Sequence, residues 1–241
     1  MKPITTLIFL MLVLGSAYGQ EHKSSSKKFQ LGINYSPDYN YRTLTINHKT
    51  QGATQVKDIR NKTESPKFGY TSGLQIALTF HPKLALNIGL QYSNKGYKLK
   101  EKPRAISESD LLDDQHYFAT RFKYSFHYID FPLSISYLIG KKRMQMVASI
   151  GVTTNIFIKE CLSIFRNTKS NQFDIHLTSH YKYNKFNLSP TIGCGINYHL
   201  LSKIDVRLEP SFRYQLLKVI NSDLSAHLWN FGMNTTILYS F

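Results

Sequence analysis

The sequence has 241 residues, a mean hydropathy of −0.28 and a formal net charge of +15, from 30 Lys and Arg against 15 Asp and Glu. This mean hydropathy would be odd for a helical membrane protein, and two cysteines, Cys161 and Cys194, do not make a disulfide framework. In a cytosolic protein the positive surplus would suggest a nucleic acid partner. Behind the export signal described next, it indicates anionic lipid headgroups, surface glycolipid phosphates or an acidic ligand instead.

The N-terminus has the pattern of a secretory signal peptide. Lys2 precedes an apolar run from 4 to 14, and Ala17 and Gly19 are the small residues that signal peptidase reads, so cleavage is expected before Gln20. A transmembrane anchor is the alternative, but this run is too short to span about 30 Å of hydrocarbon as a helix. No cysteine stands directly after the expected cleavage site, which excludes a lipoprotein anchor, and no later segment predicts a helical span. The predicted organisation is a signal peptide at 1–19, a short tail at 20–27 and an outer-membrane β-barrel domain at 28–241.

Eight segments of the mature chain alternate apolar with polar or small residues. A period of two places the apolar side chains on one face of a β-strand. The segments are 29–35, 68–80, 84–93, 122–137, 144–158, 186–198, 204–214 and 229–241. In the fourth segment, the apolar positions up to Tyr128 are even-numbered and those from Ile129 onward are odd-numbered. This change of phase predicts a β-bulge at Tyr128–Ile129.

The connections between these segments alternate in length. Three are tight turns, at 81–83, 140–143 and 199–203, and four are long, at 36–66, 99–121, 159–185 and 216–226. An up-and-down barrel with short periplasmic turns and long outward loops has this pattern.

Aromatic residues gather near both ends of the predicted strands. Tyr70, Tyr92, Tyr124, Phe186, Tyr214 and Trp229 fall toward the long loops, and Phe80, Tyr137, Tyr198, Tyr239 and Phe241 fall toward the tight turns. A soluble ligand-binding barrel would hold its apolar positions inside and has no reason for two such girdles. Membrane barrels place them at the two headgroup layers. The sequence therefore predicts an all-β fold, an eight-stranded antiparallel up-and-down transmembrane β-barrel.

One stretch resembles a known family. A strand from Tyr128 to Gly140 with Pro132-Leu133, a basic turn at 141–143 and a strand from Met144 to Ile158 around Gly151 are similar to the PorT-type outer-membrane β-barrel domain of Gram-negative bacteria. The resemblance implies a barrel in the outer membrane and a role in a protein secretion and gliding apparatus. It carries no catalytic residues.

The strongest cluster of charges lies on the predicted inward face of the seventh strand, at Asp205, Arg207, Glu209 and Arg213. An eight-stranded barrel is just filled by its side chains, so we expect these residues to plug the lumen as ion pairs. An ion or proton path is the alternative interpretation. Inward glycines such as Gly73, Gly89 and Gly193 leave a narrow pore open as a further hypothesis.

Three other groups of residues are candidate chemical sites. Asp223, Ser225 and His227 fall on alternate positions, and Ser225 with His227 could serve an outer-membrane lipid hydrolase, but a polar loop entering a strand explains them as well. His176 and His180 have no evident third metal ligand. An acidic cluster in the second long loop, at Glu108, Asp110, Asp113 and Asp114, lacks the spacing of a calcium loop. We expect no cofactor, and free thiols at Cys161 and Cys194.

The end of the last strand predicts an assembly signal. Tyr239 and Phe241 share its lipid face, which resembles the pattern read by the barrel-insertion machinery. The leading hypothesis for function is a non-enzymatic scaffold whose long loops bind a partner, with outer-membrane lipids, an anionic glycolipid or a protein of an envelope or secretion complex as candidates. The hydrolase and the narrow pore are the alternatives.

Overall fold

The computed structural model describes residues 28–47, 52–99, 102–103, 117–140, 143–168, 172–177, 183–220 and 224–241. The predicted signal peptide and tail lie outside these residues. Within the described part, no helix has the length and apolar character needed to cross a membrane.

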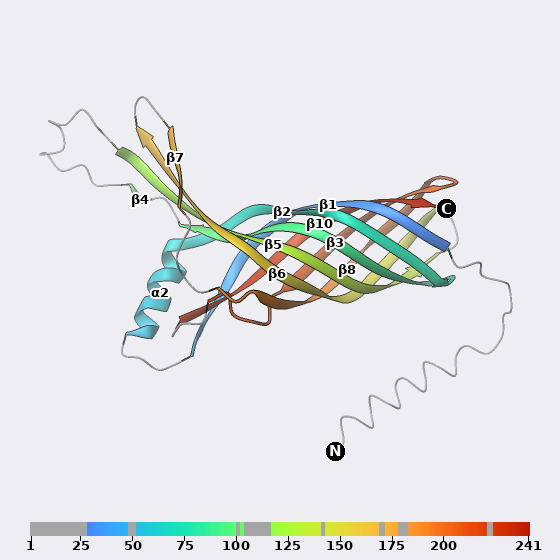
Figure 1. The fold of residues 1–241 in the computed structure, drawn as a ribbon, viewed down its shortest axis with the longest axis horizontal. Coiled ribbons are helices and arrows are strands. Elements are labelled where there is room, and N and C mark those ends of the chain that lie inside the picture. Colours follow the sequence, from blue (N-terminus) through green and yellow to red (C-terminus); the bar gives the residue numbers. More distant parts are fainter. Residues whose placement is uncertain are drawn as a thin grey trace, which may run out of the picture.

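Eight long antiparallel strands close into a barrel (Figure 1). They are β1 (Lys28–Ile46), β2 (Glu64–His81), β3 (Leu84–Leu99), β5 (Tyr117–Ile139), β6 (Met144–Thr168), β8 (Phe186–Leu201), β9 (Ile204–Tyr214) and β10 (Leu224–Ser240). Each pairs with the next, and β1 pairs with β10 from Gln30↔Ser240 to Ile46↔Leu224, which removes the free sheet edge. The predicted eight-stranded antiparallel barrel is confirmed.

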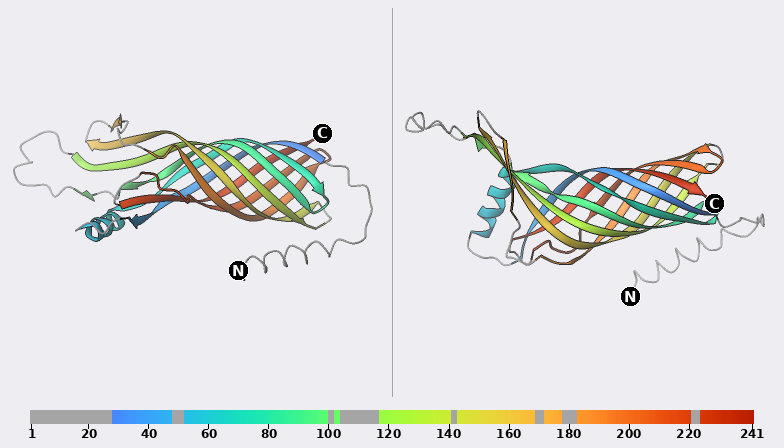
Figure 2. Two further views of the ribbon diagram at one scale, coloured as in Figure 1. Left: turned by 60° about the horizontal axis from the view of Figure 1, so that its bottom comes forward. Right: turned by 45° about the horizontal axis from the view of Figure 1, so that its top comes forward.

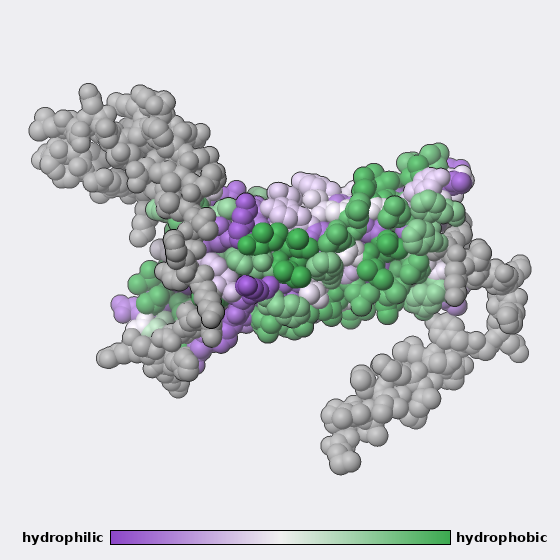
Figure 3. All heavy atoms as spheres, viewed as in Figure 1, coloured by the Kyte–Doolittle hydropathy of each residue, from purple (hydrophilic) through white to green (hydrophobic). Residues whose placement is uncertain are grey.

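The outer wall is apolar because the alternation in sequence puts every second side chain on it. Ile150 is 68% exposed and Ile192 57%, whereas the opposite face buries polar residues such as Asn34 and Asn155. Figure 3 shows the result on one face of the molecule as a green belt over the barrel strands, with hydrophilic surface beside it at the long-loop end. A soluble protein would bury this belt; a transmembrane barrel exposes it to lipid.

The predicted bulge in the fourth segment is wrong. β5 keeps one register with β3 across this point, from Gln91↔Asp130 to Lys98↔Lys123. The even positions stay inward, so Phe126 and Tyr128 are buried inside the barrel rather than exposed to lipid. The irregularity lies on the neighbouring strand, where Ile158 is skipped between His127↔Lys159 and Tyr128↔Phe157.

Several segments predicted as loops are regular structure at the long-loop end. β1 continues to Ile46, and the helix α2 (Ala53–Thr63) precedes β2. β6 continues to Thr168 and pairs with β7 (Gln172–Leu177), while β4 (Lys102–Pro103) pairs with β5. The views in Figure 2 show α2 and the ends of β5 and β6 extending beyond the same end of the barrel. The three tight turns fall where they were predicted, at the opposite end.

The barrel interior has three layers. Near the tight turns, small or aliphatic side chains are buried: Ala77, Ala85, Leu138, Val147 and Leu238. Near the long loops an aromatic-rich cluster of Tyr97, Phe126, Tyr128, Val219 and Leu228 closes the other end, with Phe157 and Tyr183 packed against it. Polar and charged side chains fill the middle layer. We call the first layer the floor and the second the cap.

Candidate functional site

The four charged residues predicted for the lumen are all buried; Asp205 lies opposite Leu238 at the floor, and the other three lie in the middle layer. Asp205 accepts a hydrogen bond from Nε2 of Gln30 at 2.8 Å, and its other oxygen lies 2.6 Å from Nδ1 of His199. Glu209 accepts a hydrogen bond from the hydroxyl of Ser149. The two acids therefore bond mainly to residues on β1, β6 and β8 rather than to the arginines of their own strand.

The two arginines also have partners on other strands. Nη1 of Arg207 donates to Oδ1 of Asn87 at 3.2 Å. Nη1 of Arg213 lies 3.6 Å from Oδ1 of Asp38, and its Nη2 donates to Oδ1 of Asn234 at 2.7 Å. The acid that pairs with Arg213 is thus on β1, in a stretch that the sequence pattern assigned to a loop.

A second buried ion pair was not predicted. Nζ of Lys95 lies 3.0 Å from Oδ2 of Asp130, and Asp130 also accepts from Nδ2 of Asn155 at 2.7 Å. The hydroxyl of Ser189 donates to Asn155 at 2.5 Å. These four side chains connect β3, β5, β6 and β8. The signal in the sequence was the position of Asp130 between Ile129 and Phe131, which the predicted phase already placed inside.

Two of the inward glycines lie against carboxylates of other strands. A methyl group on Gly193 would overlap Oε1 of Glu209, and one on Gly232 would overlap Oδ1 of Asp38. A cavity remains in the middle layer, bordered by Asn87, Arg207 and Glu209, with about 50 Å³ open to the centre of a water-sized sphere. That volume holds about four water molecules. The floor lies on one side of this cavity and the cap on the other.

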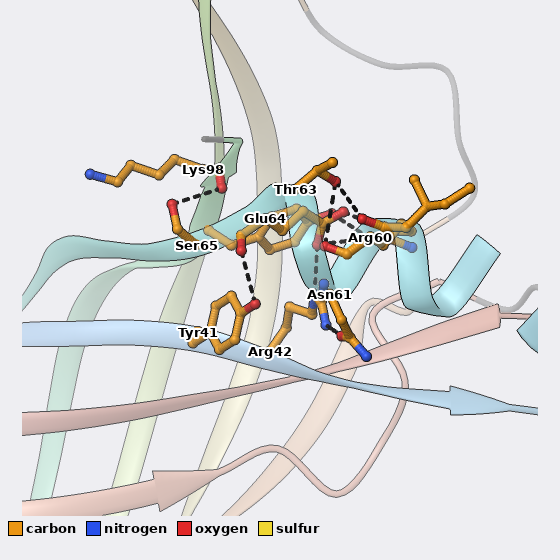
Figure 4. A network of polar contacts seen from close by, with 10 residues as sticks. Tyr41, Arg42, Arg60, Asn61, Thr63, Glu64, Ser65 and Lys98 are labelled. Carbon is orange, nitrogen blue, oxygen red and sulfur yellow. Dashed lines mark hydrogen bonds and ion pairs between the residues drawn. The ribbon is translucent and has the colours of Figure 1, made fainter. Parts of the chain in front are cut away.

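The long-loop rim has its own charged network (Figure 4). Glu64, the first residue of β2, accepts from Nε of Arg42 and from Nε of Arg60, both at 2.6 Å. Arg60 also donates to the hydroxyl of Tyr97 at 3.1 Å, and Arg42 donates to Asn61 at 2.6 Å. Burial alone lowers the pKa of Arg60, but the hydrogen bond to Glu64 and the nearby charges raise it, and the net shift is upward. Glu64 thereby joins α2 to β1 and to the cap.

Ser225 and His227 do not form a catalytic pair in the described contacts. The Ser225 hydroxyl is fully buried, donates to the Ile220 carbonyl at 3.2 Å and accepts from Asn47 at 2.6 Å. Nδ1 of His227 faces the carbonyl of Gln215 at 3.2 Å, and its ring stacks on Tyr214. The third member, Asp223, lies outside the described residues. The Ser225 hydroxyl is therefore shielded from a substrate.

The remaining candidates give no site. The acidic cluster at 108–114 and His180 lie outside the described residues, and His176 lies on β7 rather than in a loop. No group of three or more His, Cys, Asp or Glu in the described part could hold a metal ion. Cys161 and Cys194 are both free thiols, as expected.

Tyr239 and Phe241 lie on the outer face near the tight turns. The rings of Tyr239 and Phe241 meet edge to face at 5.2 Å, and Phe241 also contacts Phe29 at 5.6 Å. Their role as an assembly signal stays a prediction.

Comparison with protein families decides the class. The family described as outer membrane protein beta-barrel domain matches residues 18–216, which is more than half of the chain. The chain belongs to this family. Its members are barrels of the outer membrane, and that assignment agrees with the apolar belt and the closed ring of strands. No curated protein matches the chain at a significant level.

Solved outer-membrane barrels are similar to this family member in fold. Neisserial surface protein A is 9% identical and covers 87% of this chain and 96% of its own, with a TM-score of 0.39. OprG from Pseudomonas aeruginosa is 12% identical over 90% and 96%, with a TM-score of 0.47. The outer membrane protease OmpT from Escherichia coli is 8% identical over 92% and 100%, with a TM-score of 0.46. Identities this low carry no information on function.

Proposed function

We propose that this outer-membrane barrel is a non-enzymatic scaffold that presents a structured platform to a protein partner in a secretion or envelope complex. The platform consists of α2 and of the parts of β4, β5, β6 and β7 that extend beyond the barrel. Long loops of outer-membrane barrels face outward, so the platform stands at the cell surface side.

The continuation of β5 and β6 past the membrane carries this proposal. A transmembrane strand needs about 9–11 residues, whereas β5 has 23 residues and β6 has 25. The added length is ordered sheet, because β6 pairs with β7 from Leu162↔Leu177 to Asn167↔Gln172 and β5 pairs with β4. Ordered strands with free edges offer main-chain groups to a partner strand.

Other functions gain less support from the side chains. The buried side chains of the floor and the cap disfavour a pore, and the buried Ser225 hydroxyl disfavours a hydrolase. The similarity of residues 128–158 to the PorT-type domain favours a secretion complex over other envelope assemblies. Because of this similarity, the partner should be sought among secretion components.

Site-specific photo-crosslinking tests the proposal. A photoreactive residue at Ile59 on α2, which is 53% exposed, is compared with one at Leu201 in the opposite tight turn, which is 60% exposed. We expect Ile59 to give one discrete crosslinked protein in intact cells and Leu201 to give none.

A second variant separates the platform from the barrel. Replacing residues 165–176 by Asn-Gly forms a tight hairpin and removes β7 together with the end of β6. The Ile59 crosslink should weaken, while the equivalent replacement of Lys141–Lys142 in a tight turn should leave it unchanged. Identical crosslinks in both variants, or equal crosslinking from Leu201, would contradict a platform function.

A further inference from the structure

A group of basic side chains lies on the outer wall of β3, β5 and β6, from one to three rows beyond the aromatic girdle at Tyr92. Pairing places Lys98 directly opposite Lys123 and Lys159 directly opposite His127. Directly opposed side chains on one face have Cβ atoms about 4.5–5.5 Å apart, so the like charges of Lys98 and Lys123 destabilise this pair. We call Lys98, Lys123, His127 and Lys159 the basic wall patch.

The patch has no acid of its own. Within the described residues, no carboxylate forms an ion pair with any of its three lysines. Glu160, next to Lys159 in sequence, is buried on the other face and accepts a hydrogen bond from the hydroxyl of Tyr183. The repulsion within the patch is therefore not relieved by the protein's own described groups.

A further lysine is buried beside the patch. Lys67 is 2% exposed, and its Nζ donates to Oδ1 of Asn94 at 2.6 Å and to the hydroxyl of Ser125 at 2.7 Å. Ser125 lies on β5 between Lys123 and His127 and pairs with Cys161 of β6. A buried cation without a counter-charge is costly. An anion held over Ser125 would lie between Lys123 and His127 and would offset the charge of Lys67 as well.

The position of the patch identifies the kind of anion. The Tyr92 ring packs on Tyr70 at 6.1 Å and on His127 at 5.7 Å, and the Tyr92 hydroxyl lies 2.5 Å from Nδ1 of His127. When this hydroxyl donates to Nδ1, Nε2 carries the imidazole proton and can donate to an anion. Girdle tyrosines sit at the headgroup level of the bilayer. The patch thus begins at the height of the headgroups and faces sideways into them.

We propose that the basic wall patch, with Lys67 behind it, binds the phosphate of a glycolipid headgroup in the outer leaflet. The tyrosines contact the boundary between headgroup and acyl chains, and the lysines hold the phosphate through charge-assisted hydrogen bonds. This lipid site lies on the wall and not on the platform, so it does not depend on the proposed protein partner.

Binding of lipid A to the purified full-length barrel in detergent micelles, measured by native mass spectrometry, tests the site. The test variant is K123A/K159A. The matched control is K57A/K62A, which removes the same charge from α2, outside the wall. All proteins should show the same shift between unheated and heated samples in SDS gels, which reports a folded barrel.

A basic residue near an anionic membrane surface contributes about 1 kcal/mol, so each lysine removed should weaken lipid A binding about fivefold, and the pair about 25-fold. The control should bind as the unmodified protein does. Dephosphorylated lipid A should bind the unmodified protein as weakly as lipid A binds K123A/K159A. Equal weakening in the two double variants, binding that ignores the phosphates, or displacement of the lipid by an equal concentration of inorganic phosphate would each overturn the proposal.

Discussion

Lys95 and Asp130 form an ion pair inside the barrel, with 3.0 Å between Nζ and Oδ2 and only 1% of either side chain exposed. The ammonium also lies 5.2 Å from the centroid of the Tyr128 ring, so the pair sits directly below the cap. Removal of one partner leaves a buried charge without compensation, which is the costly change for such a pair.

Asp130→Asn should destabilise the barrel by about 3–5 kcal/mol, because Lys95 then stays buried and charged without its carboxylate. Urea unfolding in detergent micelles measures the free energy. The double variant K95M/D130L replaces the pair with apolar side chains next to the cap and should recover most of the loss. A double variant no more stable than D130N would show that the loss of stability arises from the hydrogen bonds that link Asp130 to Asn155 and Ser189, and not from the unpaired Lys95.

Ile150→Arg should cost about 2–4 kcal/mol, because it places a charge on the lipid face near the middle of the bilayer. Ile59→Arg on α2 is the matched control: the side chain is similarly exposed but lies outside the strands, so its effect should stay within about 0.5 kcal/mol. Refolding into lipid vesicles measures both. Equal costs at the two positions would mean that the green belt of Figure 3 does not face lipid.

The wall of this barrel was predictable from sequence because the chemistry of a strand face repeats every two residues. The tight turns and the inward face of β9 followed from the same pattern. The pattern failed where an inward face is itself apolar: Phe126 and Tyr128 belong to the cap, and their aromatic character was mistaken for a lipid face. The rule that inward-facing side chains of a membrane barrel are polar does not hold at this aromatic cap.

Partners in the lumen were not predictable, because they depend on strand stagger across the barrel rather than on spacing along one strand. Asp38 reaches Arg213 from β1, and Asn87 reaches Arg207 from β3. The platform was missed for a related reason. The alternation of β1 continues through Tyr39 and Tyr41, but Pro37 and Asp38 are residue types of turns and predict a loop. In β6 the alternation shifts at Lys159, although pairing continues.

Gly193 and Glu209 should be coupled. Gly193→Ala adds a methyl group that overlaps the Glu209 carboxylate, and overpacking of this kind costs about 1–3 kcal/mol. In a Glu209→Ala background only the Ser149 hydroxyl, 2.9 Å from the methyl position, stays close, so the same glycine substitution should cost much less. A double-mutant cycle measured by urea unfolding gives the coupling energy. Additive effects would mean that the backbone of β8 moves to absorb the methyl group.

The unmodified barrel should show no steady conductance in planar bilayers. The floor and the cap lie at the two ends of the polar interior, and the space between them holds about four water molecules. Gly89 borders this space, whereas the Glu209 carboxylate occupies the space beside Gly193. A reproducible ohmic current from the folded protein would restore the pore hypothesis.

Glu64→Gln should release α2 from the rim without unfolding the barrel. The carboxylate accepts from two guanidinium groups at 2.6 Å each, and a neutral amide has only one acceptor oxygen. Loss of a charge-assisted bond of this kind corresponds to roughly tenfold faster amide exchange over Ala53–Thr63. Hydrogen exchange with mass spectrometry measures this segment separately from the strands. Asp58→Asn, an exposed acid of the same helix, is the control and should leave exchange unchanged. Protection of α2 that survives Glu64→Gln would mean that packing, and not the double ion pair of Figure 4, holds the helix in place.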